Sequence, residues 1–244
     1  MTHTPDIQRP PRDLVDALAK VGTATASSEL YKLGIRDPFI EGPMPHTKGR
    51  RIAGPALTLQ FMPKREDLYG ESEYTDREKQ LHRHVLYHTQ PGDIVVVDAR
   101  GDTRSGIFGE MMLTYFAGKG GAGVVIDGCI RDSAKAFELD LGYWIRGATP
   151  NFHTQTKLMP HAVNIPIACG DAYVMPGDII IADDDGVVCV PIALAGEVAK
   201  HAGHHAEWEE FSRIQLSKGG DLRRYYPLAP EAEDEFATWK KENP

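Results

Sequence analysis

The stretch DARGDTRSGIFGEMMLTYFAGKGGAGVVIDGCIRD, residues 98–132, decides how this chain is organised. It follows an apolar run at 94–97 and passes through a Gly-bearing loop into a helix-like segment that begins at Glu110. A second apolar run, 124–126, then leads to the charged pair at 131–132. Short apolar runs bounded by turn residues predict buried strands. Two strand ends and one helix start are therefore expected to meet in a small space.

The residues at this meeting point are suited to binding an anion and a metal ion. A helix that begins near Gly109 presents unpaired backbone N–H groups, and glycine lets a ligand approach the backbone closely. Arg131 can hold a carboxylate through two hydrogen bonds. Asp132 is a hard oxygen ligand of the kind that magnesium or manganese takes, and Glu110 supplies a second carboxylate. The set suits a small 2-keto acid chelated to a divalent cation, although most Arg-Asp pairs on protein surfaces have no catalytic role.

The same residues resemble the signature of a known family. Glu110, twenty intervening residues and then Arg131-Asp132, set in GEMM and VVIDGCIRD, are similar to the pattern of the RraA-like family. That family contains the 4-hydroxy-4-methyl-2-oxoglutarate/4-carboxy-4-hydroxy-2-oxoadipate aldolases and the regulator of ribonuclease activity A. The resemblance spans roughly residues 24–219 and includes GPALTL (54–59), PGDIVVVD (91–98) and VMPGDIIIADDDGVVCVP (174–191).

The resemblance implies a fold and an activity. The fold would be a single α/β domain of the layered α/β/α swivelling-domain type, assembled as homotrimers or homohexamers with sites between subunits. The activity would be that of a lyase that requires Mg²⁺ or Mn²⁺ and acts on a 2-keto acid. It would perform retro-aldol cleavage of a 4-hydroxy-4-methyl-2-oxoglutarate-type or sugar-derived acid, decarboxylation of oxaloacetate, or both, through a pyruvate enolate.

The resemblance also assigns roles to residues. Asp132 would ligate the metal, and Glu110 would orient metal-bound water or relay a proton. Glu110 departs from the family pattern, because the aldolases commonly have Asp at this position. In the aldolases an acidic residue near the C-terminus contributes to the neighbouring subunit's site, and Glu210 or Glu207 is the candidate here. The pyruvoyl group would be held by Arg131 and by the backbone of Gly109, Glu110, Met111 and Met112.

Two other functional classes remain open. The chain could be a non-catalytic regulator that binds a ribonuclease, as the namesake of the family does, or a metabolite-binding protein without turnover. An intact Arg131-Asp132 pair with an acidic residue at position 110 favours the enzyme, since a pure binding module has no need of these three side chains.

The composition indicates a globular protein. The chain has 244 residues, of which 41% are hydrophobic and 25% charged, and a formal net charge of −8. An acidic chain without a basic patch argues against a nucleic-acid partner. No apolar run has transmembrane length and the polar N-terminus does not resemble a signal peptide, so we expect a cytoplasmic protein without a membrane partner. The three cysteines lack metal-site spacing and are expected to be buried, reduced thiols.

The remaining segments are expected to support a domain at 13–219. Residues 1–12 are predicted to be a flexible N-terminal arm, and residues 220–244 a tail that packs on a neighbouring subunit. The charged connection 64–75 is expected to be a lid or an interface loop. A helix is predicted at 76–89, where the histidines are better explained by packing than by metal binding.

Turn motifs and one polar loop complete the prediction. Gln90–Asp93 and Met175–Asp178 have the Pro-Gly centre of a type II turn leading into a strand. Asp183–Gly186 is predicted to be a hairpin, and 192–216 a long helix. In the polar loop 151–161, four side chains are candidates for contact with the distal end of a substrate: His153, Thr154, Gln155 and Lys157.

Overall fold

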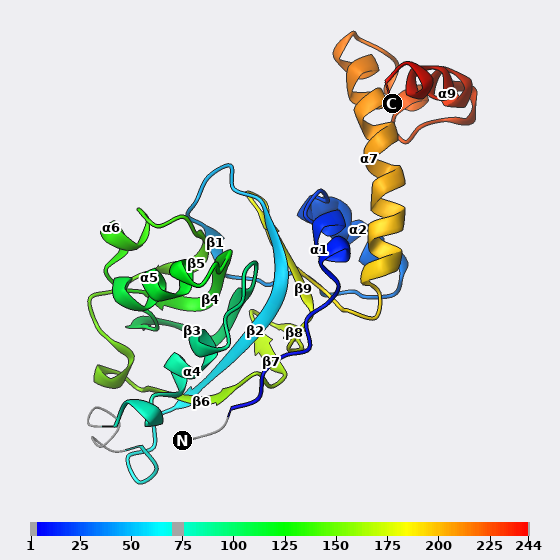
Figure 1. Cartoon of the computed structure of the whole chain (residues 1–244). Coiled ribbons are helices and arrows are strands. Elements are labelled where there is room, and N and C mark those ends of the chain that lie inside the picture. Colours follow the sequence, from blue (N-terminus) through cyan, green and yellow to red (C-terminus); the bar gives the residue numbers. More distant parts are fainter. Residues whose placement is uncertain (1–3, 70–75, 244) are drawn as a thin grey trace.

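The computed structural model describes residues 4–69 and 76–243 and shows one sheet with helices on both sides (Figure 1). The strands of this sheet run in the order β1-β5-β4-β3-β2-β9-β10, and β6 also pairs with β2. A separate two-stranded sheet is formed by β7 and β8. The strands are β1 Met44–Pro45, β2 Ile52–Pro63, β3 Ile94–Gly106, β4 Gly123–Ile130, β5 Gly142–Ala148, β6 Leu158–Val163, β7 Ile167–Cys169, β8 Ala172–Val174, β9 Ile179–Asp183 and β10 Gly186–Val190.

The long strand β2 connects two halves of the sheet. Its residues 56–60 pair in parallel with β3, whereas its residues 52–55 pair in antiparallel fashion with β9. β4 continues the parallel half next to β3, and β5 follows β4. The antiparallel half therefore begins on the same strand as the parallel half, which lets the sheet fold back on itself.

The fold-back explains why several strands are apolar on both faces. In β3, Val95 and Val97 pack in one core, beneath α4 and α5. Ile94 and Val96 point to the other face and share a second core with Ile180 of β9, with β10 and with the β7–β8 hairpin. The outer face of β9 and β10 forms a third core with α1, α2 and α7. Helices thus cover both outer faces, and the expected layered α/β fold of a single domain is confirmed.

The helices flank this sheet in two groups (Figure 1). α4, α5 and α6 lie on the parallel half, and α1, α2 and the first part of α7 lie on β9 and β10. The helices are α1 Arg12–Leu18, α2 Thr23–Lys32, η1 Arg77–Lys79, α4 Leu81–Tyr87, α5 Glu110–Gly118, α6 Ser133–Ala136, η2 His153–Gln155, α7 Ala195–Ser217, α8 Leu222–Tyr225, η3 Pro230–Ala232 and α9 Glu233–Glu242. No helix in the described ranges has the length and apolar character needed to cross a membrane.

Both Pro-Gly turns have the expected geometry. The Asp93 N–H donates to the Gln90 carbonyl at 3.1 Å, and Gly92 has a φ of 91°. The Asp178 N–H likewise donates to the Met175 carbonyl at 3.1 Å, with Gly177 at a φ of 89°. Positive φ at the third residue defines a type II turn and requires glycine. The hairpin between β9 and β10 is also confirmed.

Three local predictions differ from the structure. The loop expected after Asp98 is largely strand, because a bulge at Arg100 and Gly101, both at positive φ, lets β3 continue beside β4 as far as Gly106. The helix expected at 76–89 is two short helices, η1 and α4, separated at Gln80. Part of the polar loop 151–161 is strand β6, which pairs with the end of β2.

The N-terminal segment, expected to be a flexible arm, makes specific contacts with its own domain. Ile7 is buried in the core beneath α4. Arg9 donates to the buried carboxylate of Asp93 at 2.7 Å and to the carbonyl of His88 at 2.7 Å. The Asn164 amide donates to the Pro5 carbonyl. These contacts fix the segment along the 88–93 connection.

The C-terminal region forms an arm with the second part of α7. This arm projects from the body of the domain (Figure 1). α8 and α9 turn back onto α7 through an aromatic cluster of Phe211, Tyr225, Phe236 and Trp239. The tail therefore packs on its own long helix, and its predicted contact with another subunit stays a prediction. The connection 64–75 is described only up to residue 69, so the predicted lid or interface loop lies partly outside the described residues.

The three cysteines are free and buried, as predicted. Burial raises the pKa of the Cys129 thiol, and it raises the pKa of the Cys169 and Cys189 thiols well above their usual value. At neutral pH the three side chains are therefore protonated, and they contribute as small apolar groups.

Candidate functional site

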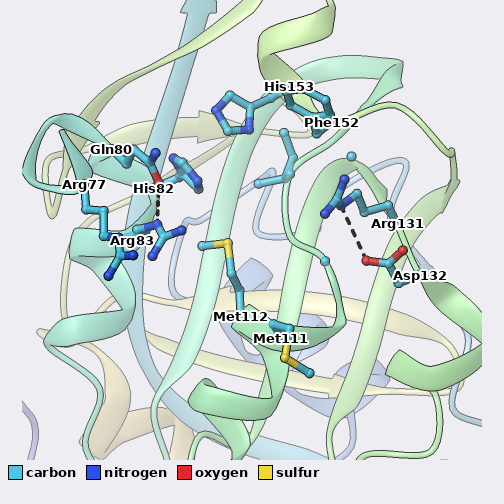
Figure 2. A pocket seen from close by; sticks show the side chains of 13 residues that line it. Arg77, Gln80, His82, Arg83, Met111, Met112, Arg131, Asp132, Phe152 and His153 are labelled. Carbon is cyan, nitrogen blue, oxygen red and sulfur yellow. Dashed lines mark hydrogen bonds and ion pairs between the residues drawn. The ribbon is translucent and has the colours of Figure 1, made fainter. Parts of the chain in front are cut away.

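A cavity of about 310 Å³ opens where β3 and β4 end and α5 begins. Arg131 and Asp132 lie on one side of it, and residues 77–83 lie on the opposite side (Figure 2). Phe152 and His153 cover one end, and Met111 and Met112 line the other end. Crevices beyond the carboxyl ends of parallel strands are the usual ligand sites of open α/β sheets.

Backbone contacts fix the wall that carries Arg131 and Asp132. The Arg131 N–H donates to the Phe108 carbonyl at 3.0 Å, which ties the end of β4 to the segment before α5. Asp132 then takes a left-handed conformation, with φ 57° and ψ 33°, and α6 begins at the next residue. Aspartate tolerates this conformation better than most residues, and such positions recur at functional sites. The sharp turn sets both side chains at the cavity.

The carboxylate of Asp132 lies at the N-terminus of α5. Its Oδ2 accepts a long hydrogen bond of 3.4 Å from the Glu110 N–H and lies 3.4 Å from Nε of Arg131. The start of a helix favours a negative charge. Asp132 Oδ1 makes no hydrogen bond within the described part of the chain, and half of the side chain is exposed. One carboxylate oxygen is therefore available to a ligand.

Gly109 allows the close approach of these side chains. A Cβ atom at this position would lie 2.7 Å from Asp132 Oδ2 and 2.8 Å from Arg131 Nε. Real Cβ atoms essentially never make such short contacts. The glycine therefore makes room for the charged pair beside the first turn of α5.

Most of the site residues expected from the sequence meet at this cavity. Gly109, Met111, Met112, Arg131 and Asp132 all line it. Glu110 contributes its backbone N–H, but its carboxylate lines an adjoining hollow of about 760 Å³ that shares Asp132. There its Oε1 accepts a hydrogen bond from the Thr114 hydroxyl at 3.2 Å. Among the lining residues in 4–69 and 76–243, Asp132 is thus the one with an acidic side chain.

The opposite wall was not expected from the sequence. It consists of Arg77, Gln80, His82 and Arg83, which come from η1 and the start of α4. The helical pattern of 76–89 predicts packing and gives no indication that its polar side chains face a site. The density of basic residues in this segment is the one available signal. His153, one of the four loop candidates, lines the cavity, and its contact with a substrate stays a prediction.

The two histidines of the cavity lie against each other. The ring centroids of His82 and His153 are 4.2 Å apart, and both side chains are buried. Burial lowers the pKa of His82 well below its usual value, and the nearby His153 and Arg83 lower it further. His82 is therefore a neutral imidazole at physiological pH.

The other histidines of this segment bond elsewhere. His84 Nε2 lies 3.0 Å from the Glu78 carbonyl, and His88 Nε2 lies 2.9 Å from the Thr4 hydroxyl. Across the described ranges, no three His, Cys, Asp or Glu side chains gather as a metal site. Asp132 alone nevertheless suits magnesium, which is commonly held by one or two carboxylates while waters and substrate oxygens complete its coordination.

Glu210 does not line the cavity within this chain. It is on α7, where it pairs with Arg213. The side chain of Glu207 lies outside the described residues. The expectation that one of these carboxylates serves a neighbouring subunit stays a prediction.

Comparison with known proteins gives relatives of two kinds. A protein of Halalkalibacterium halodurans, named "Putative 4-hydroxy-4-methyl-2-oxoglutarate aldolase", is 38% identical over 107 residues, which cover 44% of this chain and 50% of that protein. A Deinococcus radiodurans protein of the same name is 33% identical over 106 residues, 43% of this chain and 65% of that protein. The chain thus spans half to about two thirds of the length of these curated relatives.

A solved structure matches a larger part of the chain. The crystal structure of Streptomyces coelicolor RraAS2, described as an unusual member of the RNase ES inhibitor RraA protein family, superposes with a TM-score of 0.77. It is 43% identical, and the match covers 85% of this chain and 98% of that one. The family model for RraA-like proteins, described as Aldolase/RraA, matches residues 13–189. This chain therefore belongs to the RraA-like family.

Proposed function

We propose that this protein is a divalent-metal-dependent lyase that cleaves a carbon-carbon bond of a 2-keto acid. The observation that carries the proposal is the pairing of Arg131 with Asp132 at the N-terminus of α5, inside a cavity. Arg131 can bind the carboxylate of a 2-keto acid. Asp132, beside it, can ligate a Mg²⁺ or Mn²⁺ ion that would contact the keto oxygen. The aldolase names of the curated relatives support the same reaction class.

In the proposed mechanism Arg131 binds the substrate carboxylate. The Phe152 ring lies 5.7 Å from the guanidinium carbon, and Asp132 Oδ2 faces Nε, so the outer nitrogens are directed to the substrate. The N–H of Met111, in the first turn of α5, has no acceptor within the helix and can donate to the same substrate. A metal ion held by Asp132 would stabilise the charge that develops on the keto oxygen.

Two reactions share this arrangement. In retro-aldol cleavage the C3–C4 bond breaks, its electron pair passes to the pyruvate enolate, and the 4-hydroxyl loses its proton as C4 becomes a carbonyl. In decarboxylation of oxaloacetate, the electron pair of the bond to the departing carboxylate passes to the same enolate. Protonation at C3 gives pyruvate in both reactions. Glu110, in the adjoining hollow, is the proposed acceptor of the hydroxyl proton.

The site is also proposed to lie beside a second subunit. Met111 is 70% exposed and Tyr115 is 43% exposed on the outer face of α5, and the Tyr115 ring lies 6.3 Å from that of Tyr87. Exposed apolar side chains that cluster in this way are typical of protein interfaces. They support a homotrimer or homohexamer in which this face is covered.

The test is pyruvate release from oxaloacetate and from 4-hydroxy-4-methyl-2-oxoglutarate, with Mg²⁺, with Mn²⁺ and with a chelator. We expect release that requires metal, and a fall of kcat/KM by about 100- to 1,000-fold in Asp132→Asn. Asparagine keeps the shape of the side chain and tolerates the left-handed backbone. Asp171→Asn is the matched control, since Asp171 is an exposed aspartate with a φ of 65° outside the cavity.

A second candidate function is that of a ribonuclease regulator. The RraAS2 relative favours it, because its family is described as RNase ES inhibitors and it matches most of this chain. Stoichiometric inhibition of a ribonuclease by chelator-treated protein, together with no metal-dependent pyruvate release from either substrate, would replace the lyase proposal by this one.

A further inference from the structure

The cavity is more basic than the binding of a simple 2-keto acid requires. Three arginines, Arg77, Arg83 and Arg131, line it, and among the described lining residues the one carboxylate is that of Asp132. Arg131 and Asp132 contact each other on one side. Arg77 and Arg83 lie together on the opposite side (Figure 2). The two basic groups of the cavity are therefore separated across its width.

Among the described residues, no carboxylate forms an ion pair with the arginines of the second wall. In the described ranges neither Arg77 nor Arg83 is part of an ion pair, whereas Arg65, Arg9 and Arg131 each are. The Arg83 Nε donates to the Gln80 side-chain oxygen, which orients the guanidinium group and leaves its outer nitrogens to other acceptors. A guanidinium held in one orientation is well suited to an oxyanion.

The other residues that are described in the cavity wall carry no negative charge. His82 is a neutral imidazole, because burial lowers its pKa. Met112 and Ile107 line the cavity as well, and Met112 lies between its two sides (Figure 2). A ligand that reaches from one side to the other would therefore meet an arginine at each end and apolar side chains in the middle. Contacts in this spatial order fit a ligand that is a short carbon chain with an anionic group at each end.

We propose that Arg77 and Arg83 form a second oxyanion subsite, which binds a carboxylate or phosphate at the end of the substrate remote from the 2-keto acid. The inference rests on the proposed function, which places the 2-keto acid at Arg131. It disfavours sugar-derived 2-keto acids that lack a second anionic group, since a hydroxyl group makes weaker hydrogen bonds with a guanidinium than an ionised oxyanion does. Doubly anionic acids would be selected.

Calorimetric binding in the presence of Mn²⁺ tests this proposal. The ligands are pyruvate, which reaches only the Arg131 side, 2-oxoglutarate, which carries a distal carboxylate, and a 2-keto acid with a terminal phosphate. The double variant Arg77→Met, Arg83→Met is compared with wild type and with Arg65→Met. Arg65 is the matched control because it is an exposed arginine in the connection before η1 that does not line the cavity. Melting temperatures confirm that the variants fold.

We expect the double variant to bind the doubly anionic ligands about 10- to 100-fold more weakly than wild type, with pyruvate affinity unchanged. Whichever doubly anionic ligand binds wild type more tightly identifies carboxylate or phosphate as the preferred group. Equal weakening for pyruvate and the doubly anionic ligands, or no weakening, overturns the subsite. If wild type binds 2-oxoglutarate through these arginines but does not bind pyruvate, the subsite stands and the proposed function fails. If wild type binds none of the ligands, both are overturned.

Discussion

The two sides of the cavity differ in how they are built. Arg131 and Asp132 are placed by the end of a buried parallel strand, by a left-handed residue and by a glycine that leaves no free space. Arg77 and Arg83 are placed by one 3₁₀ turn and a seven-residue helix, where the Gln80 N–H donates to the Arg77 carbonyl and the Arg83 N–H donates to the Gln80 carbonyl. The backbone of the first side is therefore bonded to a distant segment, whereas these backbone bonds of the second side stay within its own short helices. We infer that the first side determines the reaction and the second determines which substrates enter it.

The strongest test of this difference is Gly109→Ala. The new Cβ would collide with both Asp132 Oδ2 and Arg131 Nε, so the charged pair must move. We expect kcat/KM to fall by about 100-fold, as displacement of catalytic groups by about 1 Å commonly causes, with little change in the free energy of unfolding, because both displaced side chains are partly exposed and can move.

Gly118→Ala at the other end of α5 is the matched control for this variant. A Cβ at Gly118 would have no neighbour within 4 Å. We expect unchanged kinetics and a free energy of unfolding that is equal or higher by up to about 1 kcal/mol. Full activity of Gly109→Ala would show that the first side tolerates displacement, and the contrast between the two sides would be lost.

Arginine-to-lysine replacement should separate the two sides more finely. Lysine keeps the charge but cannot form two parallel hydrogen bonds with a carboxylate. We expect Arg131→Lys to raise the Kd for pyruvate by about tenfold. Arg77→Lys, on the more exposed side, should change the Kd for 2-oxoglutarate by about twofold, the usual range of a surface substitution. Similar losses at both positions in calorimetry would indicate that the second side is as rigid as the first.

The smallest expected effect concerns the pH dependence of stability. His82 has a pKa well below its usual value in the folded protein because it is buried. The unfolded chain therefore binds a proton more readily, and folding loses stability as the pH falls below about 6.5. This residue contributes a loss of at most about 1.4 kcal/mol per pH unit.

Replacement of His82 measures that contribution. Between pH 7.5 and pH 5.5, we expect the melting temperature of His82→Gln to fall less than that of wild type. His161→Gln, which changes an exposed histidine on β6, should behave as wild type does. A wild-type pH dependence that is unchanged in His82→Gln would mean that other groups cause it.

Much of the fold was predictable, because apolar runs and Pro-Gly turns are local signals. The runs at 94–97 and 124–126 became β3 and β4, and both Pro-Gly turns have the expected geometry. That the sheet folds back on itself was not predictable. An apolar run has the same pattern whether a helix or another strand covers it. β7 and β8 were missed for a related reason, since three-residue strands leave no clear period.

The candidate site was predictable only in part. Motif spacing located Arg131, Asp132 and the start of α5, which the chain brings together through neighbouring strands. It could not locate Arg77 and Arg83, because they reach the cavity from a segment that precedes β3 in the sequence and pairs with no strand of the site. It also could not show that the carboxylate of Glu110 points to the adjoining hollow, which depends on side-chain direction.

The three buried thiols have a practical consequence for spectroscopy. Since Cys129, Cys169 and Cys189 are protonated and enclosed, the native protein should be nearly inert to thiol-directed labels. A cysteine introduced at the exposed Met111 would then be the one position that a fluorophore or spin label modifies readily. Such a label would report, from the rim of the cavity, on ligand occupancy and on the arrival of a second subunit.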